Sequence, residues 1–252
     1  MDPIAFWLVA ARLSGLFAAV PGVSDFSIPT VVKAGLLIWL TFFLTPLTPA
    51  ANYAISGVVG LVFIGMGELV IGAGLGLVVK MCMVVMQFAG MLVDNELGLT
   101  AAEQLNPAVT ISGGVFGRVF VIAGMVYFWV LDYFTLVLMG LVKSFEIIPM
   151  AHFISNIGIK TLVNVGSSIL ISGFAIAIPI LAVSFMTTFA LGLISKAVQG
   201  LNIMFLSFTI RLGVGLAAVI VFLPLLLFMI RKQLGTILPR ITDYMVELNK
   251  LT

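Results

Sequence analysis

The sequence predicts an all-α integral membrane protein built from long apolar helices. Its 252 residues are 62% hydrophobic and 9% charged, whereas soluble domains carry about 25% charged residues. The mean hydropathy is +1.28, and several apolar runs satisfy the rule of roughly 18 residues for a bilayer-spanning helix. A membrane barrel would need repeated strand-like segments of about ten residues with alternating polarity, and the sequence has none.

Six apolar segments predict the helices, and turn-forming residues separate them. We expect helices over Ile4–Val20, Val31–Leu44, Ile55–Val93, Val115–Val142, Leu162–Ser195 and Ile203–Ile230. The breaks after the first five are, in order, PGVSDFSIP, TPLTPAAN, LNPAVTISGG, PMAHFISN and VQGLN, and their proline, glycine, asparagine and serine residues favour turns. We assign residues 1–230 to one helical membrane domain and residues 231–252 to a tail.

Two of the segments are too long for a simple crossing of the membrane. The segment Ile55–Val93 has 39 residues, which is about 58 Å of helix against a hydrocarbon core of roughly 30 Å. It therefore either folds back as a helical hairpin or is not confined to lipid. In Leu162–Ser195, Pro179 removes a helix hydrogen bond and favours a kink or a reversal. Such segments suit helices that are buried in other protein.

The C-terminal tail has the pattern of an amphipathic helix. Its basic residues outnumber its acidic ones, which predicts a cytoplasmic location. The apolar residues recur at helical spacing, and we expect them to contact a membrane or a partner; the alternative is that the tail packs on its own protein. The residues expected to contact a partner are Ile237, Ile241, Tyr244 and Leu248.

The segment from Met91 to Val109 gathers acidic residues in an otherwise apolar chain. Three of the ten acidic residues of the protein, Asp94, Glu96 and Glu103, lie within ten positions of each other. Leu97, Leu99 and Leu105 lie among them. This apolar content argues against the alternative, which is an ordinary solvated loop. Non-helical backbone at membrane depth is tolerated where it is buried in protein or lines a water-filled cavity. The segment therefore predicts a loop inside an aqueous vestibule.

Isolated charges in apolar segments predict ion pairs between helices or between subunits. Glu68 is the clearest case, because a charge at the bilayer centre costs at least about 2.5 to 3.5 kcal/mol on insertion scales. We favour a structural ion pair for Glu68; the alternative is a proton-coupling role together with Lys80. The residues expected to be buried charges or to pair across subunits are Arg12, Lys33, Glu68, Lys80, Arg118, Asp132 and Arg211.

The sequence argues against an enzyme, a metal site and a cofactor site. His152 is the single histidine, and it has no nearby pattern of base and nucleophile. Cys82 is the single cysteine, and flexible packing explains the methionines around it better than copper binding does. The glycines of the GxGxG motif at Gly72–Gly76 follow no strand, so they favour close helix packing over nucleotide binding. A net charge of +2 gives no support for nucleic-acid binding.

Six blocks of sequence, in a fixed order, carry a resemblance to a known family. They are RLSGLFAAVPGVSDFSIPTVVKAGLLIWL, GELVIGAGLGLVV, AGMLVDNELGLTAAEQLNPA, SFEIIP, GFAIAIPILAVSF and LISKAVQGLNIMFLSFTIRLGVG. Together they resemble the FliR/SctT family of flagellar and type III secretion export-gate subunits. In the first block the matching residues are Arg12, Pro21, Ile28, Pro29, Val32, Lys33 and Gly35, and in the third they are Ala89, Gly90, Gly98, Leu99, Asn106 and Pro107.

The resemblance implies a core subunit of the flagellar export gate in the bacterial inner membrane, at the flagellar basal body. Its expected partners are the P-type and Q-type gate subunits, which would form a helical, cone-shaped channel with it, the B-type switch protein, and unfolded proteins as the exported substrate. An injectisome subunit of the same family is the alternative, and a proton-coupled secondary transporter is a more distant one. The segment from Leu97 to Gly113, within the loop of residues 90–114, would be the plug. The expected plug or gate residues are Asp94, Glu96, Leu97, Gly98, Leu99, Glu103, Leu105, Asn106 and Pro107.

Overall fold

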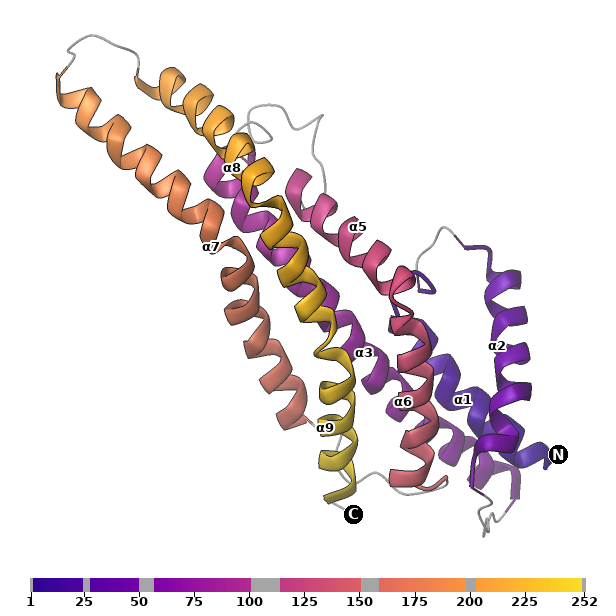
Figure 1. Ribbon diagram of the computed structural model, residues 1–252. Helices are drawn as coiled ribbons and strands as arrows, with labels where there is room; N and C mark the ends of the chain where they lie inside the picture. Colours follow the sequence, from indigo (N-terminus) through magenta and orange to yellow (C-terminus); the bar gives the residue numbers. More distant parts are fainter. Residues whose placement is uncertain are drawn as a thin grey trace. The chain divides into compact units, whose positions relative to one another are not determined.

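The computed structural model describes residues 2–24, 28–49, 57–100, 114–150, 159–197 and 203–250, and none of these residues lies in a strand. The all-α prediction is therefore confirmed for the described residues (Figure 1). The elements are α1 (Pro3–Ala19), α2 (Thr30–Leu44), the short 3₁₀ helix η1 (Thr45–Leu47), α3 (Gly57–Leu97), α5 (Val115–Val130), α6 (Tyr133–Ile147), α7 (Ile159–Ala197), α8 (Ile203–Leu234) and α9 (Ile237–Lys250).

The long segments are single helices. Helix α3 runs for 41 residues, about 62 Å, so of the two alternatives given for this segment the fold-back within it is excluded. Helix α7 runs for 39 residues with Pro179 inside it, so the chain does not reverse there. A proline removes only one helix hydrogen bond, and the buried neighbours Ala177 and Ile180 supply packing on both sides of it.

The fourth predicted segment forms two helices and not one, although its hydropathy does not predict a break. Helix α5 ends at Val130 and α6 begins at Tyr133, although the junction contains neither proline nor glycine. Asp132 lies there with φ 60° in the left-handed region, which aspartate tolerates better than most side chains. The hydroxyl of Thr135 donates a hydrogen bond of 3.1 Å to the Asp132 carboxylate. The helix therefore breaks at Asp132, where the backbone is left-handed and the side chain accepts a hydrogen bond from Thr135.

Among the described residues, four helical stretches are long and apolar enough to cross a membrane: Thr30–Leu47, Gly57–Leu97, Lys160–Lys196 and Leu206–Asn249. The broken pair α5 and α6 would make a fifth if it forms one span. In the most apolar window of α3, 61% of the residues are buried, compared with 17% in the stretch that contains α2. Helix α3 is therefore a core element, whereas α2 presents most of its surface outward.

The chain divides into two compact units that share its long helices. The first unit comprises residues Met1–Cys82, Phe128–Ser167 and Gly235–Thr252, and the second comprises Met83–Tyr127 and Ser168–Leu234. The first unit thus contains α1, α2, η1, α6, α9, the N-terminal parts of α3 and α7, and the last residues of α5. The second contains α8, most of α5 and the remaining parts of α3 and α7.

Glycines on α3 bring its neighbours close in the first unit. A Cβ atom at Gly72 would overlap the backbone carbonyl of Arg12 on α1, and one at Gly76 would lie 2.7 Å from the carbonyl oxygen of Leu16. A Cβ at Gly74 would overlap the hydroxyl of Tyr244 on α9. The GxGxG motif therefore does what its spacing predicts, which is to let helices approach closely.

Helix α9 packs against its own chain. It lies beside α6 (Figure 1), where Gly140 leaves room for Ile241. The Nη1 atom of Arg240 donates to the Sγ atom of buried Cys82 at 3.5 Å. The four residues predicted to contact a partner are 0–5% exposed: Ile237, Ile241, Tyr244 and Leu248. That prediction is wrong for this face, because the amphipathic pattern is satisfied by the chain's own helices.

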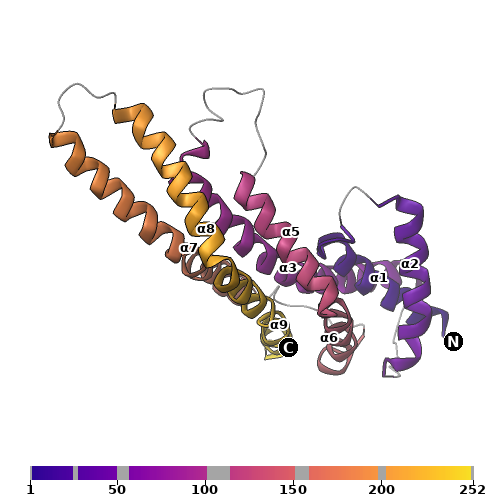
Figure 2. The same ribbon diagram turned by 45° about the horizontal axis from the view of Figure 1, so that its top comes forward.

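In the second unit, α5 runs alongside the C-terminal part of α3 (Figure 2). Gly90 of α3 lies against the backbone at Phe116 and Gly117 of α5, and a side chain at Gly90 would overlap it. On α7, Phe174 packs edge-to-face on Phe88 of α3 with ring centroids 5.8 Å apart. The end of α3 is thus fixed between neighbouring helices.

We expect Gly74→Ala to loosen α9, because the added methyl group would occupy the place of the Tyr244 hydroxyl. Overpacking of this kind costs typically about 1–3 kcal/mol. Cys82 is the single cysteine of the chain and is buried beneath Arg240, so its rate of maleimide labelling in detergent reports the release of α9. That rate should rise in Gly74→Ala.

Gly67→Ala is the matched control, since a Cβ there has no heavy atom within 4 Å. This variant should label at the wild-type rate, and the better helix propensity of alanine should leave its stability unchanged or raised. Equal rates of Cys82 labelling in the two variants would contradict the conclusion that the Tyr244 side chain packs against Gly74.

Candidate gate segment and buried charge network

Arg12 is the centre of a buried polar network in the first unit. It is fully buried, and its Nε atom donates to Oε2 of Glu68 on α3 at 2.6 Å. Its Nη1 atom donates to Oγ of Ser144 at 2.9 Å, and its Nη2 atom donates to the carbonyl of Ile148 at 3.2 Å. One side chain of α1 therefore joins α3 to α6 and to the residue that follows α6.

The chemistry of the guanidinium group explains why arginine fits here. Its planar fork offers five N–H donors in fixed directions, and in this network the donors point to a carboxylate, a hydroxyl and a carbonyl. The flat face lies 4.0 Å from the ring centroid of Phe145, which adds a cation–π contact. Because Glu68 is also almost fully buried, the pair is electrically neutral, and neither charge is left unpaired in a low-dielectric core.

The network argues against the alternative role of Glu68, which was proton coupling together with Lys80. The coupling pair of Glu68 with Lys80 is not formed, because Glu68 bonds to Arg12 and Lys80 is exposed. Arg118 and Asp132 are also exposed on this chain, and Lys33 and Arg211 are half-buried. The Nε atom of Arg211 is buried without a hydrogen-bond partner among the described residues. Pairing of these five residues with other subunits stays a prediction.

Asp94 is the most firmly held residue of the acidic segment. Its carboxylate is fully buried and accepts a hydrogen bond from the backbone amide of Phe116 at Oδ1, 3.0 Å, and another from Gly117 at Oδ2, 3.1 Å. These amides lie in the first turn of α5, where backbone donors have no partner within the helix. The carboxylate therefore caps α5 from α3, and the positive end of the helix favours its negative charge.

The next residues of the segment are anchored on α7 and α8. The Oγ atom of Ser184 on α7 donates to Oε2 of Glu96 at 3.1 Å and lies 3.3 Å from the Glu96 carbonyl oxygen. Leu97 is fully buried, and a side chain at Gly215 of α8 would lie 2.5 Å from it. Helix α3 then ends at Gly98, whose φ of 78° lies in the left-handed region typical of a helix C-terminus.

Three of the predicted gate residues are thus held by other helices: Asp94 by α5, Glu96 by α7 and Leu97 by α8. Gly98 faces the ring of Phe208, 3.2 Å from where a Cβ would lie, and Leu99 is half-buried. Four further predicted gate residues lie outside the described residues: Glu103, Leu105, Asn106 and Pro107.

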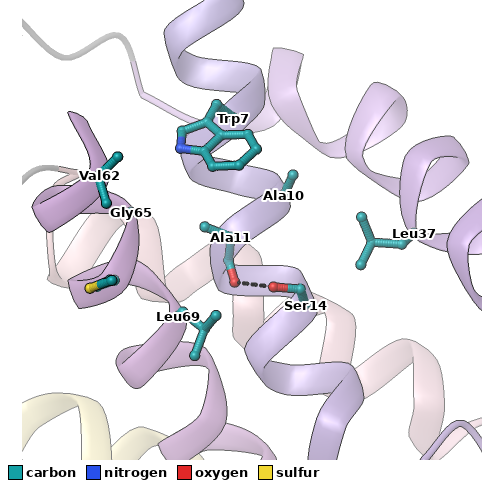
Figure 3. A pocket seen from close by; sticks show the side chains of 9 residues that line it. Trp7, Ala10, Ala11, Ser14, Leu37, Val62, Gly65 and Leu69 are labelled. Atoms are coloured by element: carbon teal, nitrogen blue, oxygen red, sulfur yellow. Dashed lines mark hydrogen bonds between the residues drawn. The ribbon is translucent and has the colours of Figure 1, made fainter. Parts of the chain in front are cut away.

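A pocket of about 360 Å³ lies in the first unit between α1, α2 and α3 (Figure 3). Its lining includes Trp7, Leu37 and Leu69, and its one hydroxyl group, that of Ser14, donates to the Ala11 carbonyl. No ionisable side chain lines it, so it offers no acid, base or metal ligand. In the described part of the chain, no three His, Cys, Asp or Glu side chains gather as a metal site would require.

Sequence reasoning missed the polar partners of the network and of the segment. Ser144 and Ile148 hold Arg12, and Ser184 holds Glu96, yet serines and main-chain carbonyls carry no sequence signal of their own. A further case is Glu247 of α9, whose carboxylate accepts hydrogen bonds from the amide, at 2.7 Å, and from the hydroxyl of Thr161 near the start of α7. The one available signal was the scarcity of acids in an apolar chain.

The fold and the site together define a helical membrane subunit whose buried charges join helices and whose acidic segment is anchored among them. Residues 4–237 match the family described as bacterial export proteins, family 1. This match covers most of the chain, which therefore belongs to that family.

Individual relatives agree with this assignment. The flagellar biosynthetic protein FliR of Escherichia coli (strain K12) is 24% identical over 96% of this chain and 93% of its own length. The FliR protein of Pectobacterium carotovorum is 28% identical over 88% of this chain and 84% of its own length. The Yop proteins translocation protein T of Yersinia pestis is 23% identical, with 87% and 85% covered. The resemblance to the FliR/SctT family is thus confirmed.

We expect a double-mutant cycle at Arg12 and Glu68 to show strong coupling. Arg12→Met or Glu68→Met alone should lower the free energy of unfolding by about 3–5 kcal/mol, because each removes the opposite charge from a buried ion pair. The double variant should be more stable than either single variant. The measurement is denaturant-induced unfolding of the purified chain in detergent.

Lys80→Met serves as the control, since this exposed cation should change stability by no more than about 0.5 kcal/mol. Simple additivity of the effects at Arg12 and Glu68 would contradict the assignment of their contact as a coupled buried pair.

Proposed function

We propose that this chain is a core subunit of the flagellar type III protein export gate in the bacterial inner membrane, at the flagellar basal body. With P-type and Q-type subunits it forms the channel through which unfolded flagellar proteins are secreted, and the B-type switch protein binds its cytoplasmic side. The observation that carries the proposal is the family match over residues 4–237. Relatives named for flagellar biosynthesis that align over most of both chains support it.

The described structure suits a subunit that is embedded in other protein. Helix α2 exposes a row of large apolar residues, among them Ile38, Trp39, Phe42 and Phe43, each more than half exposed. Helices α3 and α7 are longer than a bilayer is thick,. Apolar faces of this extent need a cover of lipid or protein, and neighbouring helical subunits of a gate provide one.

Within this proposal, the segment from Leu97 to Gly113 is the plug that obstructs the channel when export is off. Support comes from its described base, where Asp94, Glu96 and Leu97 are bound to α5, α7 and α8. A loop that must obstruct a channel needs a base held in a defined place, and these contacts supply one. The buried leucine and the two bound carboxylates do not behave as the start of a freely solvated connector.

An injectisome role for the same fold is the second candidate, and the relative from Yersinia pestis favours it. The two roles share the channel and differ in the neighbouring subunits. A proton-coupled transporter loses its main support, because the pair of Glu68 with Lys80 is not formed.

We expect deletion of residues 101–106 to make the assembled gate leaky to small ions. This deletion leaves Leu97 and its packing against Gly215 in place, so it removes loop without removing the anchored base. Conductance would be measured in planar bilayers on gates assembled with P-type and Q-type subunits, with the intact chain as the control. An unchanged barrier in correctly assembled gates would count against a plug.

The choice between flagellum and injectisome is tested by co-expression. The chain should co-purify in a stable particle with flagellar P-type and Q-type subunits, and more weakly with the corresponding injectisome subunits. Preferential assembly with the injectisome set would reverse the assignment. Assembly with neither set would remove the gate proposal.

A further inference from the structure

We propose that the pocket between α1, α2 and α3 binds one acyl chain of a membrane phospholipid. The pocket has a volume of about 360 Å³ and lies within the first unit (Figure 3). A cavity of about 150 Å³ is enough to hold a benzene ring, so one aromatic side chain inserted by a neighbouring protein would fill less than half of this pocket. The lipid site is independent of the gate function proposed above.

Two matching helix faces form the walls of the pocket. The lining residues of α1 lie within residues 7–14 and those of α3 within residues 62–69, and both sets follow the spacing i, i+3, i+4 and i+7 of a single helix face,. Small residues in the middle of each set, such as Ala11 and Gly65, leave the space between the helices open. Seven residues of helix extend for about 10 Å, which is about two thirds of one leaflet of a hydrocarbon core about 30 Å thick. The pocket is therefore long enough for most of one acyl chain.

The chemistry of the lining favours hydrocarbon over water as the content of the pocket. The hydroxyl group of Ser14, the one hydroxyl among the lining residues, already donates to the Ala11 carbonyl at 2.8 Å. An internal water needs about two to four polar partners, and these walls do not offer them. An empty space of this size would forfeit dispersion contacts on all its walls. A flexible, unbranched hydrocarbon chain avoids both costs.

The pocket opens on an apolar surface that lipid tails can reach. Three of its lining residues on α3, Val62, Met66 and Leu69, are 46–59% exposed, so the pocket has its mouth at the surface of α3. Neither residues 3–11 of α1 nor residues 57–67 of α3 include an ionisable side chain. An acyl chain therefore enters the pocket without passing a charged group.

Trp7 places a hydrogen-bond donor at one end of the pocket (Figure 3). Its indole ring lies against Gly65, where a Cβ atom would come within 3.1 Å of the ring nitrogen Nε1. Tryptophan favours the boundary between lipid tails and headgroups, because its ring is apolar and its N–H group is polar. We therefore place the ester group of the lipid at Trp7, where an ester oxygen accepts from the N–H group, and the tail toward Ser14.

The pocket should not distinguish between lipid headgroups. No charged side chain lines it, whereas recognition of anionic headgroups depends on clusters of lysine and arginine. Phosphatidylethanolamine and phosphatidylglycerol that carry the same acyl chains should therefore bind equally well. A preference for the anionic lipid would show that charges outside the pocket select the ligand, and would contradict recognition through the acyl chain.

The test uses phospholipids with brominated acyl chains, which quench the fluorescence of a tryptophan that they contact. Two forms of the whole chain are compared in detergent: Trp39→Phe with Trp129→Phe retains only Trp7, and Trp7→Phe with Trp129→Phe retains only Trp39. The two tryptophans are matched in exposure, at 52% and 57%, but Trp39 does not line the pocket. We expect quenching of Trp7 at an about 10-fold lower lipid concentration. Equal concentration dependence for both tryptophans would overturn the proposal.

Ala11→Phe, made in the form that retains Trp7, fills the pocket from within. This variant should remove the quenching at low lipid concentration. Ala18→Phe is the matched control, since Ala18 is an exposed residue of α1 that does not line the pocket, and it should leave the quenching unchanged. Labelling of Cys82 at the wild-type rate shows that the first unit has kept its fold. Undiminished quenching in folded Ala11→Phe would also overturn the proposal, and the comparison of Trp7 with Trp39 holds without this variant.

A third measurement separates lipid from protein as the occupant of the pocket. The same quenching is recorded after assembly with P-type and Q-type subunits, and we expect it to persist. Loss of the Trp7 quenching on assembly would show that a neighbouring subunit covers the pocket, and would overturn the lipid assignment. Failure to assemble would count against the gate function alone, because the lipid measurements on the isolated chain would stand.

Discussion

The ion pair between Arg12 and Glu68 is the contact on which the first unit depends. It lies where α1, α3 and α6 meet, and each of the three guanidinium nitrogens donates one hydrogen bond that holds them. A buried pair of this kind adds little net stability compared with a well-packed apolar contact, but it tolerates few other arrangements. Its contribution is therefore to fix which helices are neighbours in a chain where most surfaces are equally apolar.

Two further acids, the buried Asp94 and the half-buried Glu247, follow one rule, which is that each is held by an element distant in sequence. Asp94 of α3 binds the first turn of α5, and Glu247 of α9 binds Thr161 in the first turn of α7. Both carboxylates face helix N-termini, where the unpaired amides and the helix dipole favour negative charge. A chain with ten acidic residues thus uses several of them to order its helices, which explains their positions better than solvation does.

Hydropathy was enough to predict the helical class and the approximate extent of most helices, because burial of apolar residues dominates this chain. It failed where a few polar contacts decide the structure. The break between α5 and α6 depends on the left-handed backbone at Asp132, and the choice of Arg12 over Lys80 as the partner of Glu68 depends on which helix faces α3.

The tail was amphipathic as predicted, but periodicity alone cannot say which surface covers an apolar face. For the gate segment, the scarcity of acids pointed to Asp94 and Glu96, whereas their partners Ser184 and the amides of α5 are ordinary residues in the sequence.

The position of Arg12 and Glu68 along the chain has a consequence for biosynthesis. They are separated by 56 residues, and the arginine is made first. Until α3 has been synthesised, α1 carries a cation whose transfer to lipid costs about 2.5–3.5 kcal/mol on insertion scales. Once α3 has been made, Glu68 can neutralise this charge. The contact that fixes the neighbours of α3 in the folded protein therefore also means that α1 gains its counter-ion only after α3 has been synthesised.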